Sequence, residues 1–311
     1  MKVMLFKRLL QLITVIWGVG TLTFILMRSL PGDMAYRIAA SRYGQDNVDS
    51  QAAALVREEL KLDQSALTAY WHWLTDLMQL KLGDSLVSGL PVIDTVQHML
   101  GHSLLLAFAG LIVSVLIAVP LGLLSAWRGN PLDSILMGLS SVIRSMPVFV
   151  IGVLFILLFA LNWNLFPVAG FGSPAHLVLP AITLALSLAA VSNRVVRDSA
   201  KKTFQSAFYQ FSQVKGLSLW QTFRRHGARN IALPVVAFFG IQLVSMIEGI
   251  VMIESLFSWP GIGHGLAHAI FARDIPVIQG SALMMGILFV LLNTLVDIIC
   301  LWIDPRGVKN Q

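Results

Sequence analysis

The sequence has little charge and almost no cysteine. Only 12% of its 311 residues are charged, whereas about 25% is typical of soluble globular proteins. Hydrophobic residues make up 56% of the chain and the mean hydropathy is +0.76, which excludes a disordered or collagen-like chain and argues against a soluble enzyme. The single cysteine, Cys300, excludes an intrachain disulfide and a disulfide-stabilised scaffold. The composition therefore predicts an integral membrane protein.

Long apolar runs are the dominant feature that is present. A helix that crosses the hydrocarbon core of a bilayer needs about 20 mainly apolar residues. Pro120, Pro147, Pro180 and Pro234 lie inside or at the edges of such runs, and prolines are tolerated in membrane helices. The sequence predicts six transmembrane helices, at Leu9–Met27, His102–Trp127, Ser134–Leu161, His176–Val195, Ile231–Ile253 and Val277–Trp302.

The distribution of Lys and Arg predicts that both termini are cytoplasmic. With the N-terminus inside, the inner segments hold fourteen of the 22 basic residues, and the short outer loops hold only Arg273. The long outer segment, residues 31–100, carries more acidic than basic residues, but long loops cross the membrane regardless of charge. The basic pI, about 9.7, is therefore a signal of topology, and no nucleic-acid partner is expected.

The outer segment is predicted to form a small helical cap. Gln51–Leu60 has the pattern of a short amphipathic helix. Tyr70, Trp71 and Trp73 are typical of aromatic residues that lie at the membrane surface.

The loop between the fourth and fifth spans, residues 194–230, is basic but not uniformly polar. Apolar residues from Phe204 to Leu217 recur at steps of three and four, which predicts an amphipathic helix that stops at Gly216. A second short helix is predicted at Leu219–Arg229. A basic amphipathic helix can lie on anionic lipid or can dock on a cytoplasmic partner.

Several short motifs, in their order and spacing, resemble the membrane-spanning subunits of bacterial ATP-binding-cassette (ABC) importers of the peptide/nickel/opine permease family. The resemblance covers nearly the whole chain. The motifs that carry it are Phe6-Lys7-Arg8-Leu9-Leu10, Leu30-Pro31-Gly32-Asp33, Leu62-Asp63-Gln64, Tyr70-Trp71, Leu82-Gly83-Asp84-Ser85-Leu86, Val119-Pro120-Leu121-Gly122, Ser145-Met146-Pro147, Ser258-Trp259-Pro260-Gly261-Ile262-Gly263, Arg273-Asp274-Ile275-Pro276-Val277-Ile278-Gln279 and Asp304-Pro305-Arg306.

This resemblance implies an all-α integral membrane protein with the type I ABC importer permease fold. It divides the chain into an N-terminal transmembrane anchor (1–30), a periplasmic segment (31–100), a permease core (101–303) that contains the cytoplasmic coupling loop (194–230), and a cytoplasmic tail (304–311). The first apolar run is too long for a signal peptide and no cleavage site follows it, so the anchor is expected to be retained.

In this family the cytoplasmic loop carries a coupling helix, with a Glu-Ala-Ala motif, that docks in a groove on the ATPase subunit. Aligned on Gly216, the motif falls on Gln210, Phe211 and Ser212, and Lys215 precedes the glycine as in the family. Gln210 replaces the acid, and Phe211 and Ser212 replace the alanines. The resemblance thus assigns ATPase coupling to these five residues, without a contact made by a glutamate.

The resemblance also implies the partners. The sequence contains no GxxxxGK[ST] phosphate-binding loop, so ATP and Mg²⁺ are expected on a separate ATPase, and this chain is expected to bind no cofactor and to catalyse no reaction. Two ATPase subunits, a second homologous permease subunit, a periplasmic substrate-binding protein and membrane lipid are the expected partners. The expected location is the bacterial inner membrane.

Two ionisable residues, Arg144 and Glu248, lie within predicted spans. Such residues are costly in lipid and often mark a translocation pathway. They can form a salt bridge with each other, contact the cargo, or extend to the membrane interface.

Two His-x3-His pairs, His98/His102 and His264/His268, lie on the predicted outer side. Residues four apart share one face of a helix, and paired imidazoles suit Ni²⁺ or Zn²⁺. The alternative is that these are scattered interfacial histidines. If they bind metal, they are expected to make weak contacts during transit, because a permease must release its cargo; no firm metal site is predicted.

The function predicted from the sequence is that of a permease subunit in an ATP-driven, binding-protein-dependent importer, which forms half of the translocation pathway. The resemblance extends to nickel and dipeptide permeases; chelated nickel is the predicted cargo and a di- or oligopeptide is the alternative. An ATP-independent secondary transporter is the rival of another class. An intramembrane enzyme is not supported, since the sequence contains neither GxSxG nor HExxH.

Overall fold

The structure is a computed structural model that describes residues 2–29, 32–44, 48–59, 65–79, 81–129 and 131–303. The described residues are predominantly helical, and their only β-type pairing is an isolated antiparallel bridge between Asp84 and Pro91. The predicted tail, residues 304–311, lies outside this part of the chain.

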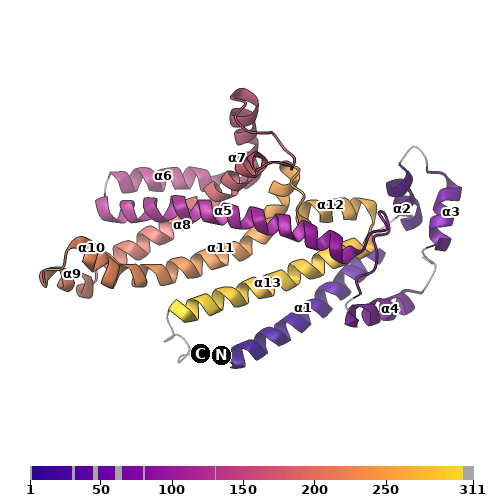
Figure 1. The fold of residues 1–311 in the computed structure, drawn as a ribbon, viewed down its shortest axis with the longest axis horizontal. Coiled ribbons are helices and arrows are strands. Elements are labelled where there is room, and N and C mark those ends of the chain that lie inside the picture. Colours follow the sequence, from indigo (N-terminus) through magenta and orange to yellow (C-terminus); the bar gives the residue numbers. More distant parts are fainter. Residues whose placement is uncertain are drawn as a thin grey trace. The chain divides into compact units, whose positions relative to one another are not determined.

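The helices follow one another along the chain (Figure 1). They are α1 (Lys2–Ser29), α2 (Met34–Tyr43), α3 (Ser50–Glu59), α4 (Ala66–Met78), α5 (Val92–Arg128), α6 (Leu132–Ser145), α7 (Val148–Phe155), a π-helical segment (Ile156–Asn162), α8 (Ala175–Phe204), α9 (Ala207–Val214), α10 (Leu219–Thr222), a second π-helical segment (Phe223–Gly227), α11 (Ala228–Leu256), α12 (Ile262–Ala272) and α13 (Ile275–Ile303).

Within the described ranges, five helical stretches are long and apolar enough to cross a membrane, and a sixth is added if one bent pair of helices is counted as a single span. These stretches coincide with the six predicted spans, so the predicted all-α multi-pass fold is confirmed. The predicted bounds were too short at several ends. The helix around His102–Trp127 already begins at Val92, and the one around His176–Val195 continues to Phe204.

The third predicted span, Ser134–Leu161, is not one continuous helix. It is bent by 98° between α6 and α7. Met146 is extended (ψ 132°) and Pro147 follows it with ψ 141°, because a residue before proline is driven out of the helical region. Pro120, Pro180 and Pro234, in contrast, lie inside unbroken helices.

The chain forms two compact units. Unit 1 contains Met1–Ser103 and Pro260–Val290, and unit 2 contains Leu104–Trp259 and Leu291–Gln311. The contacts within unit 1 join the predicted anchor and the predicted outer segment with a part of the predicted core that is distant in sequence.

A buried polar cluster connects distant segments of unit 1. Asp274, in the turn between α12 and α13, is 4% exposed. Its carboxylate accepts a hydrogen bond from the Ser85 hydroxyl and another, of 3.0 Å, from the Leu86 backbone N–H. The Arg42 guanidinium donates to the Leu86 carbonyl and to Glu59, on α3. These bonds hold helices α2 and α3 and the 81–91 turn against the α12–α13 connection.

The aromatic residues of α4 pack within the protein to a greater extent than predicted. Tyr70 and Trp73 lie against Phe24 of α1, with ring centroids 5.3 and 6.0 Å from it, and the Tyr70 hydroxyl is 2.9 Å from the Thr21 hydroxyl. Only Trp71 is clearly exposed. The rings of Tyr70 and Trp73 therefore also contact α1, and their predicted place at the membrane surface stays a prediction.

The core of unit 2 lies between α5, α8 and α11. Gly122 of α5 permits close approach to α8, because a Cβ atom at this position would lie 2.7 Å from the Val196 Cβ. The buried residues of this core are Ala118, Ala189, Val196, Ala200, Ile231, Val235 and Phe239. Small residues at the contacts are typical of helices that pack in lipid.

Candidate functional site

The 194–230 loop forms a short separate helix, α9, at one end of unit 2 (Figure 1). The sequence pattern predicted that Phe204 belongs to this helix, but Phe204 ends α8 and the chain breaks at Ser206, which is extended (ψ 145°). The predicted stop is confirmed, since α9 ends at Val214 and Gly216 has a φ of +87°, which glycine adopts without steric cost.

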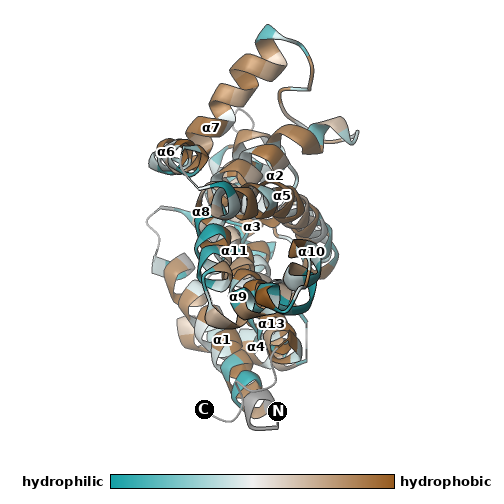
Figure 2. Cartoon of the chain, turned by 90° about the vertical axis from the view of Figure 1, so that its left-hand side faces the viewer, coloured by the Kyte–Doolittle hydropathy of each residue, from teal (hydrophilic) through white to brown (hydrophobic). Residues whose placement is uncertain are grey.

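One exposed side of α9 is apolar. Phe208, Phe211 and Val214, here called the α9 apolar face, are 49%, 59% and 82% exposed. They are spaced at three residues, so they lie along one side of the helix. In Figure 2, which views this end of unit 2, hydrophilic and hydrophobic segments alternate in the loop, whereas α7 is almost uniformly hydrophobic. Three adjacent exposed apolar side chains in a basic loop indicate an interaction surface.

The opposite side of α9 holds the helix in place. Tyr209 is 6% exposed and its ring centroid lies 5.3 Å from that of Phe204. A Cβ atom at Gly227 would lie 3.1 Å from the Tyr209 ring, so glycine makes room for this contact. Burial raises the pKa of the Tyr209 phenol. Tyr209 thereby fixes the direction in which the α9 apolar face points, and the sequence reasoning did not identify it.

The structure divides the five predicted coupling residues between the two sides of α9 and its end. Gln210 and Phe211 are exposed on the helix. Lys215 is exposed at its end, with Nζ 4.8 Å from the centroid of the Phe211 ring, a cation–π contact. Ser212 is buried, and its hydroxyl donates to the Tyr209 carbonyl at 2.7 Å. Ser212 therefore supports the helix from inside.

The second helix of the loop begins where the sequence predicts but does not end there. Ser218 and Gln221 form a reciprocal capping box at the start of α10. The helix then continues through Phe223–Gly227 into α11, so the predicted end at Arg229 was wrong. Leu219 and Trp220 are exposed beside α9. The capping residues were recognisable in the sequence, but the absence of a boundary was not, because the chain continues by a π-helical turn.

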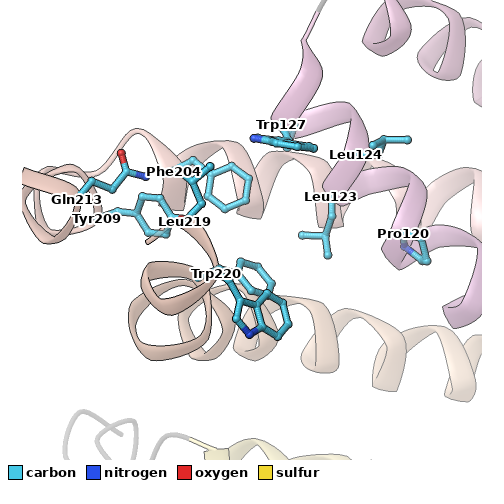
Figure 3. A pocket seen from close by; sticks show the side chains of 11 residues that line it. Pro120, Leu123, Leu124, Trp127, Phe204, Tyr209, Gln213, Leu219 and Trp220 are labelled. Carbon is cyan, nitrogen blue, oxygen red and sulfur yellow. The ribbon is translucent and has the colours of Figure 1, made fainter. Parts of the chain in front are cut away.

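A pocket of about 520 Å³ lies between this loop and the end of α5 (Figure 3). Trp127, Leu123 and Leu124 line it from α5, and Tyr209, Gln213 and Trp220 line it from the loop. The lining is mostly aromatic and aliphatic. The pocket separates α9 and α10 from α5, so these two short helices do not pack tightly against α5.

The predicted pathway residues lie on different helices. Arg144 is exposed in the last turn of α6, immediately before the Pro147 break. Glu248 belongs to α11, but its side chain lies outside the described part of the structure. The predicted salt bridge and the predicted contact with cargo both remain predictions.

The two histidine pairs lie on neighbouring helices of unit 1. His98 is exposed and His102 is half-buried on α5, while His264 and His268 lie on α12. The Nε2 atoms of His264 and His268 are 3.2 Å apart. Burial, and to a lesser extent the charge of His268, lowers the pKa of His264. The described ranges contain no group of three or more His, Cys, Asp or Glu residues that could hold a metal ion.

This architecture is that of a multi-pass helical membrane protein, with an exposed apolar face on one loop helix. The family described as "Binding-protein-dependent transport system inner membrane component" matches residues 118–308. The family that describes the N-terminal part of such membrane components matches residues 1–106. The chain belongs to this family and is an ABC importer inner-membrane permease of the peptide/nickel family.

Similar proteins include the glutathione transport system permease protein GsiC of Salmonella choleraesuis (strain SC-B67), which is 34% identical over 300 residues and 96% of each chain. GsiC of Escherichia coli (strain K12) is 33% identical over the same lengths. A chain from the crystal structure of an amino acid ABC transporter with histidines has a TM-score of 0.54 and 14% identity, over 67% of this chain and 93% of that chain. This last similarity concerns the fold alone.

Proposed function

We propose that this permease couples cargo import to ATP hydrolysis by a separate ATPase, through the α9 apolar face. The observation that carries the proposal is the exposure of Phe208, Phe211 and Val214 on a helix whose opposite side is anchored by Tyr209. An anchored helix whose apolar face points away from the rest of the protein fits the helix-in-groove mode of recognition.

The energetics favour an ordered partner for this face. Full burial of a side chain of this size contributes roughly 1.5–3 kcal/mol, so covering these three partly exposed side chains with an apolar groove is favourable. Lys215 above the Phe211 ring adds a positive charge at the edge of the patch, where a partner with an acidic rim gains electrostatic attraction. Lipid is the competing occupant, because basic amphipathic helices also bind anionic membrane surfaces.

The remaining parts of the proposal follow from charge and family. The basic loop and both termini face the cytoplasm of a bacterial inner membrane. A second permease subunit completes the pathway, two ATPase subunits bind below, and a periplasmic binding protein delivers cargo to the outer segment. ATP stabilises one conformation of the complex over the other and thereby shifts its population.

The docking role is tested by a substitution that changes only the α9 apolar face. Phe211→Asp should abolish co-purification of the ATPase, because a carboxylate would be buried in an apolar contact. Phe211→Leu retains an apolar side chain at the same site and should retain the ATPase. Membrane insertion of both variants is the control. Normal co-purification of the ATPase with inserted Phe211→Asp would refute the docking role.

We propose a small peptide as the cargo. The support is the 34% identity to glutathione permeases over 96% of the chain. Uptake of labelled glutathione and of a labelled dipeptide should fall in a strain that lacks this permease and should recover when the wild-type gene is restored. Unchanged uptake of both compounds would contradict a peptide cargo.

Chelated nickel is the second candidate, favoured by the proximity of His264 and His268. Uptake of radioactive nickel in the same deletion strain separates the two. A loss of nickel uptake with normal peptide uptake would establish nickel as the cargo and reject the peptide.

A further inference from the structure

The two histidine side chains of α12 lie in contact with each other. His264 and His268 occupy adjacent turns, their ring planes are 79° apart and their ring centroids are 4.5 Å apart. The two Nε2 atoms are 3.2 Å apart. Without a metal, one Nε2–H group donates a hydrogen bond to the other ring nitrogen.

We propose that His264 and His268 form an open binding site for one divalent transition-metal ion. Metal–imidazole bonds of about 2.0–2.1 Å, drawn from one ion to nitrogens that are 3.2 Å apart, meet at an angle of about 100°. This angle lies between those of neighbouring ligands in square-planar and tetrahedral sites. The nitrogen spacing therefore already suits an ion, and each ring turns about its side-chain bonds to point its lone pair at that ion.

The chemistry of the two ligands selects the class of ion. Two imidazoles without a carboxylate suit Cu²⁺, Ni²⁺ and Zn²⁺, and they do not suit Mg²⁺ or Ca²⁺, which prefer oxygen ligands. Because the described residues supply no cluster of three such ligands, at least two coordination positions remain for water or for a small chelating molecule. An open site of this kind binds weakly and exchanges its ion.

The helix that carries the pair is held firmly. The Ile262 backbone N–H, at the start of α12, donates to the Ser103 hydroxyl of α5 at 2.8 Å. Gly265, between the two histidines, lies directly against the Met99 side chain, where a Cβ atom would clash. Anchoring at these points limits the motion of α12, and a rigid helix lowers the entropic cost of holding two ligands around one ion.

The site lies outside the membrane-length helices, since α12 is a shorter apolar helix. It does not depend on which cargo the permease carries, because the inference concerns binding of the ion and not its transport. Failure of nickel or peptide uptake therefore leaves the metal site unaffected. Absence of the metal site removes the structural support for nickel as cargo and leaves the proposed ATP-driven import unaffected.

The test is a metal titration of the permease complex, purified without a histidine tag and stripped with a chelator. Isothermal titration calorimetry with Ni²⁺ and with Cu²⁺ should show saturable binding of one ion per chain. Loss of even a second-shell partner weakens metal sites by about 10–100-fold, so His264→Gln and His268→Gln should each weaken binding by about 100-fold or more. The Cu²⁺ complex of the wild type should give an electron paramagnetic resonance spectrum with coupling to two imidazole nitrogens.

The His98/His102 pair is the matched control, because it has the same spacing on a neighbouring helix. The double variant His98→Gln/His102→Gln should bind the ion with unchanged affinity. Three results would overturn the proposal: no saturable binding by the wild type, binding that survives both α12 substitutions, or binding that is lost with the α5 pair. If an α12 variant fails to assemble, the spectrum of the wild-type Cu²⁺ complex decides, and a spectrum without two coupled imidazoles rejects the site.

Discussion

At the scale of single residues, the end of α9 depends on one backbone conformation. Gly216 has a φ of +87°, and open space surrounds the position where its Cβ atom would be. A side chain at Gly216 therefore meets no steric clash with neighbours and acts only through the backbone.

We expect Gly216→Ala to strain this turn by about 1–2 kcal/mol. The strain should alter the end of α9 and weaken ATPase binding by up to about 30-fold, since each 1.4 kcal/mol corresponds to a tenfold change in affinity. The measurement is the dissociation constant of the purified permease–ATPase complex. Gly138→Ala, inside α6 and also in open space, is the control and should leave the affinity unchanged. An unaltered affinity in Gly216→Ala would show that the turn does not position the docking face.

A second residue-scale prediction concerns the buried carboxylate of unit 1. Asp274→Asn places an amide where two donors, the Ser85 hydroxyl and the Leu86 N–H, now meet a carboxylate. Loss of a buried hydrogen bond should destabilise unit 1 by about 1–3 kcal/mol, which thermal denaturation of the purified protein would detect as a lower Tm. Asp76→Asn, at an exposed position on α4, should leave the Tm unchanged. Equal Tm values for the two variants would contradict the structural role of Asp274.

Single residues also mark the limit of what the sequence could predict. The stop at Gly216 follows from glycine chemistry alone, and it was predicted. Asp274 and Ser85 were both recognised in motifs, but their contact joins segments that are 189 residues apart, and no local pattern encodes such a pairing. The burial of Tyr209 depends in the same way on Phe204 and Gly227, which lie on other helical segments.

At the scale of elements, an ion pair holds α6 against α8. Arg197 of α8 donates from Nε to the Asp133 carboxylate at 2.8 Å and makes a second contact with it through its NH2 group. The Ser125 hydroxyl of α5 donates to the same carboxylate at 2.6 Å. Three helices of unit 2 thus meet at one largely buried carboxylate.

We predict that Asp133→Ala destabilises the protein by about 2 kcal/mol or more, somewhat less than the 3–5 kcal/mol of a fully buried pair. The substitution leaves the guanidinium of Arg197 partly buried without the Asp133 carboxylate. Thermal denaturation measures the effect. Arg57→Gln breaks the exposed Arg57–Asp33 pair and should cost less than about 1 kcal/mol. If both substitutions had the same small effect, Asp133 would not be holding α6 in place.

The elements themselves were predictable from hydropathy, but their breaks were not. Four prolines lie in or beside the predicted spans, and only Pro147 accompanies a sharp bend. The sequence alone could not distinguish it from Pro120, Pro180 and Pro234, because packing and the conformation of Met146 decide where a helix ends. The amphipathic pattern likewise predicted α9, but it extended the helix across the break at Ser206.

At the scale of the whole molecule, the orientation across the membrane rests on the distribution of Lys and Arg. This distribution predicts that Gln205, beside α9, lies in the cytoplasm and that Ser88, in the turn before α5, lies outside. Both positions are exposed, so a cysteine at either one is accessible to a thiol reagent.

In a Cys300→Ala background, we expect Ser88→Cys to react with a membrane-impermeant maleimide in intact spheroplasts. Gln205→Cys should react only after the membrane is permeabilised. Labelling is measured by gel shift, and the Cys300→Ala parent is the blank. The reverse pattern would invert the topology and remove the α9 apolar face from the compartment that contains ATP.

The α9 apolar face is the proposed point at which ATP hydrolysis acts on the permease. Transport of labelled cargo into proteoliposomes that contain the complete importer, with its binding protein added in the donor compartment, tests this directly. We expect uptake only when ATP is present, normal uptake for Phe211→Leu, and no uptake for Phe211→Asp. Uptake by this chain without nucleotide, or a wild-type rate with Phe211→Asp, would contradict this role.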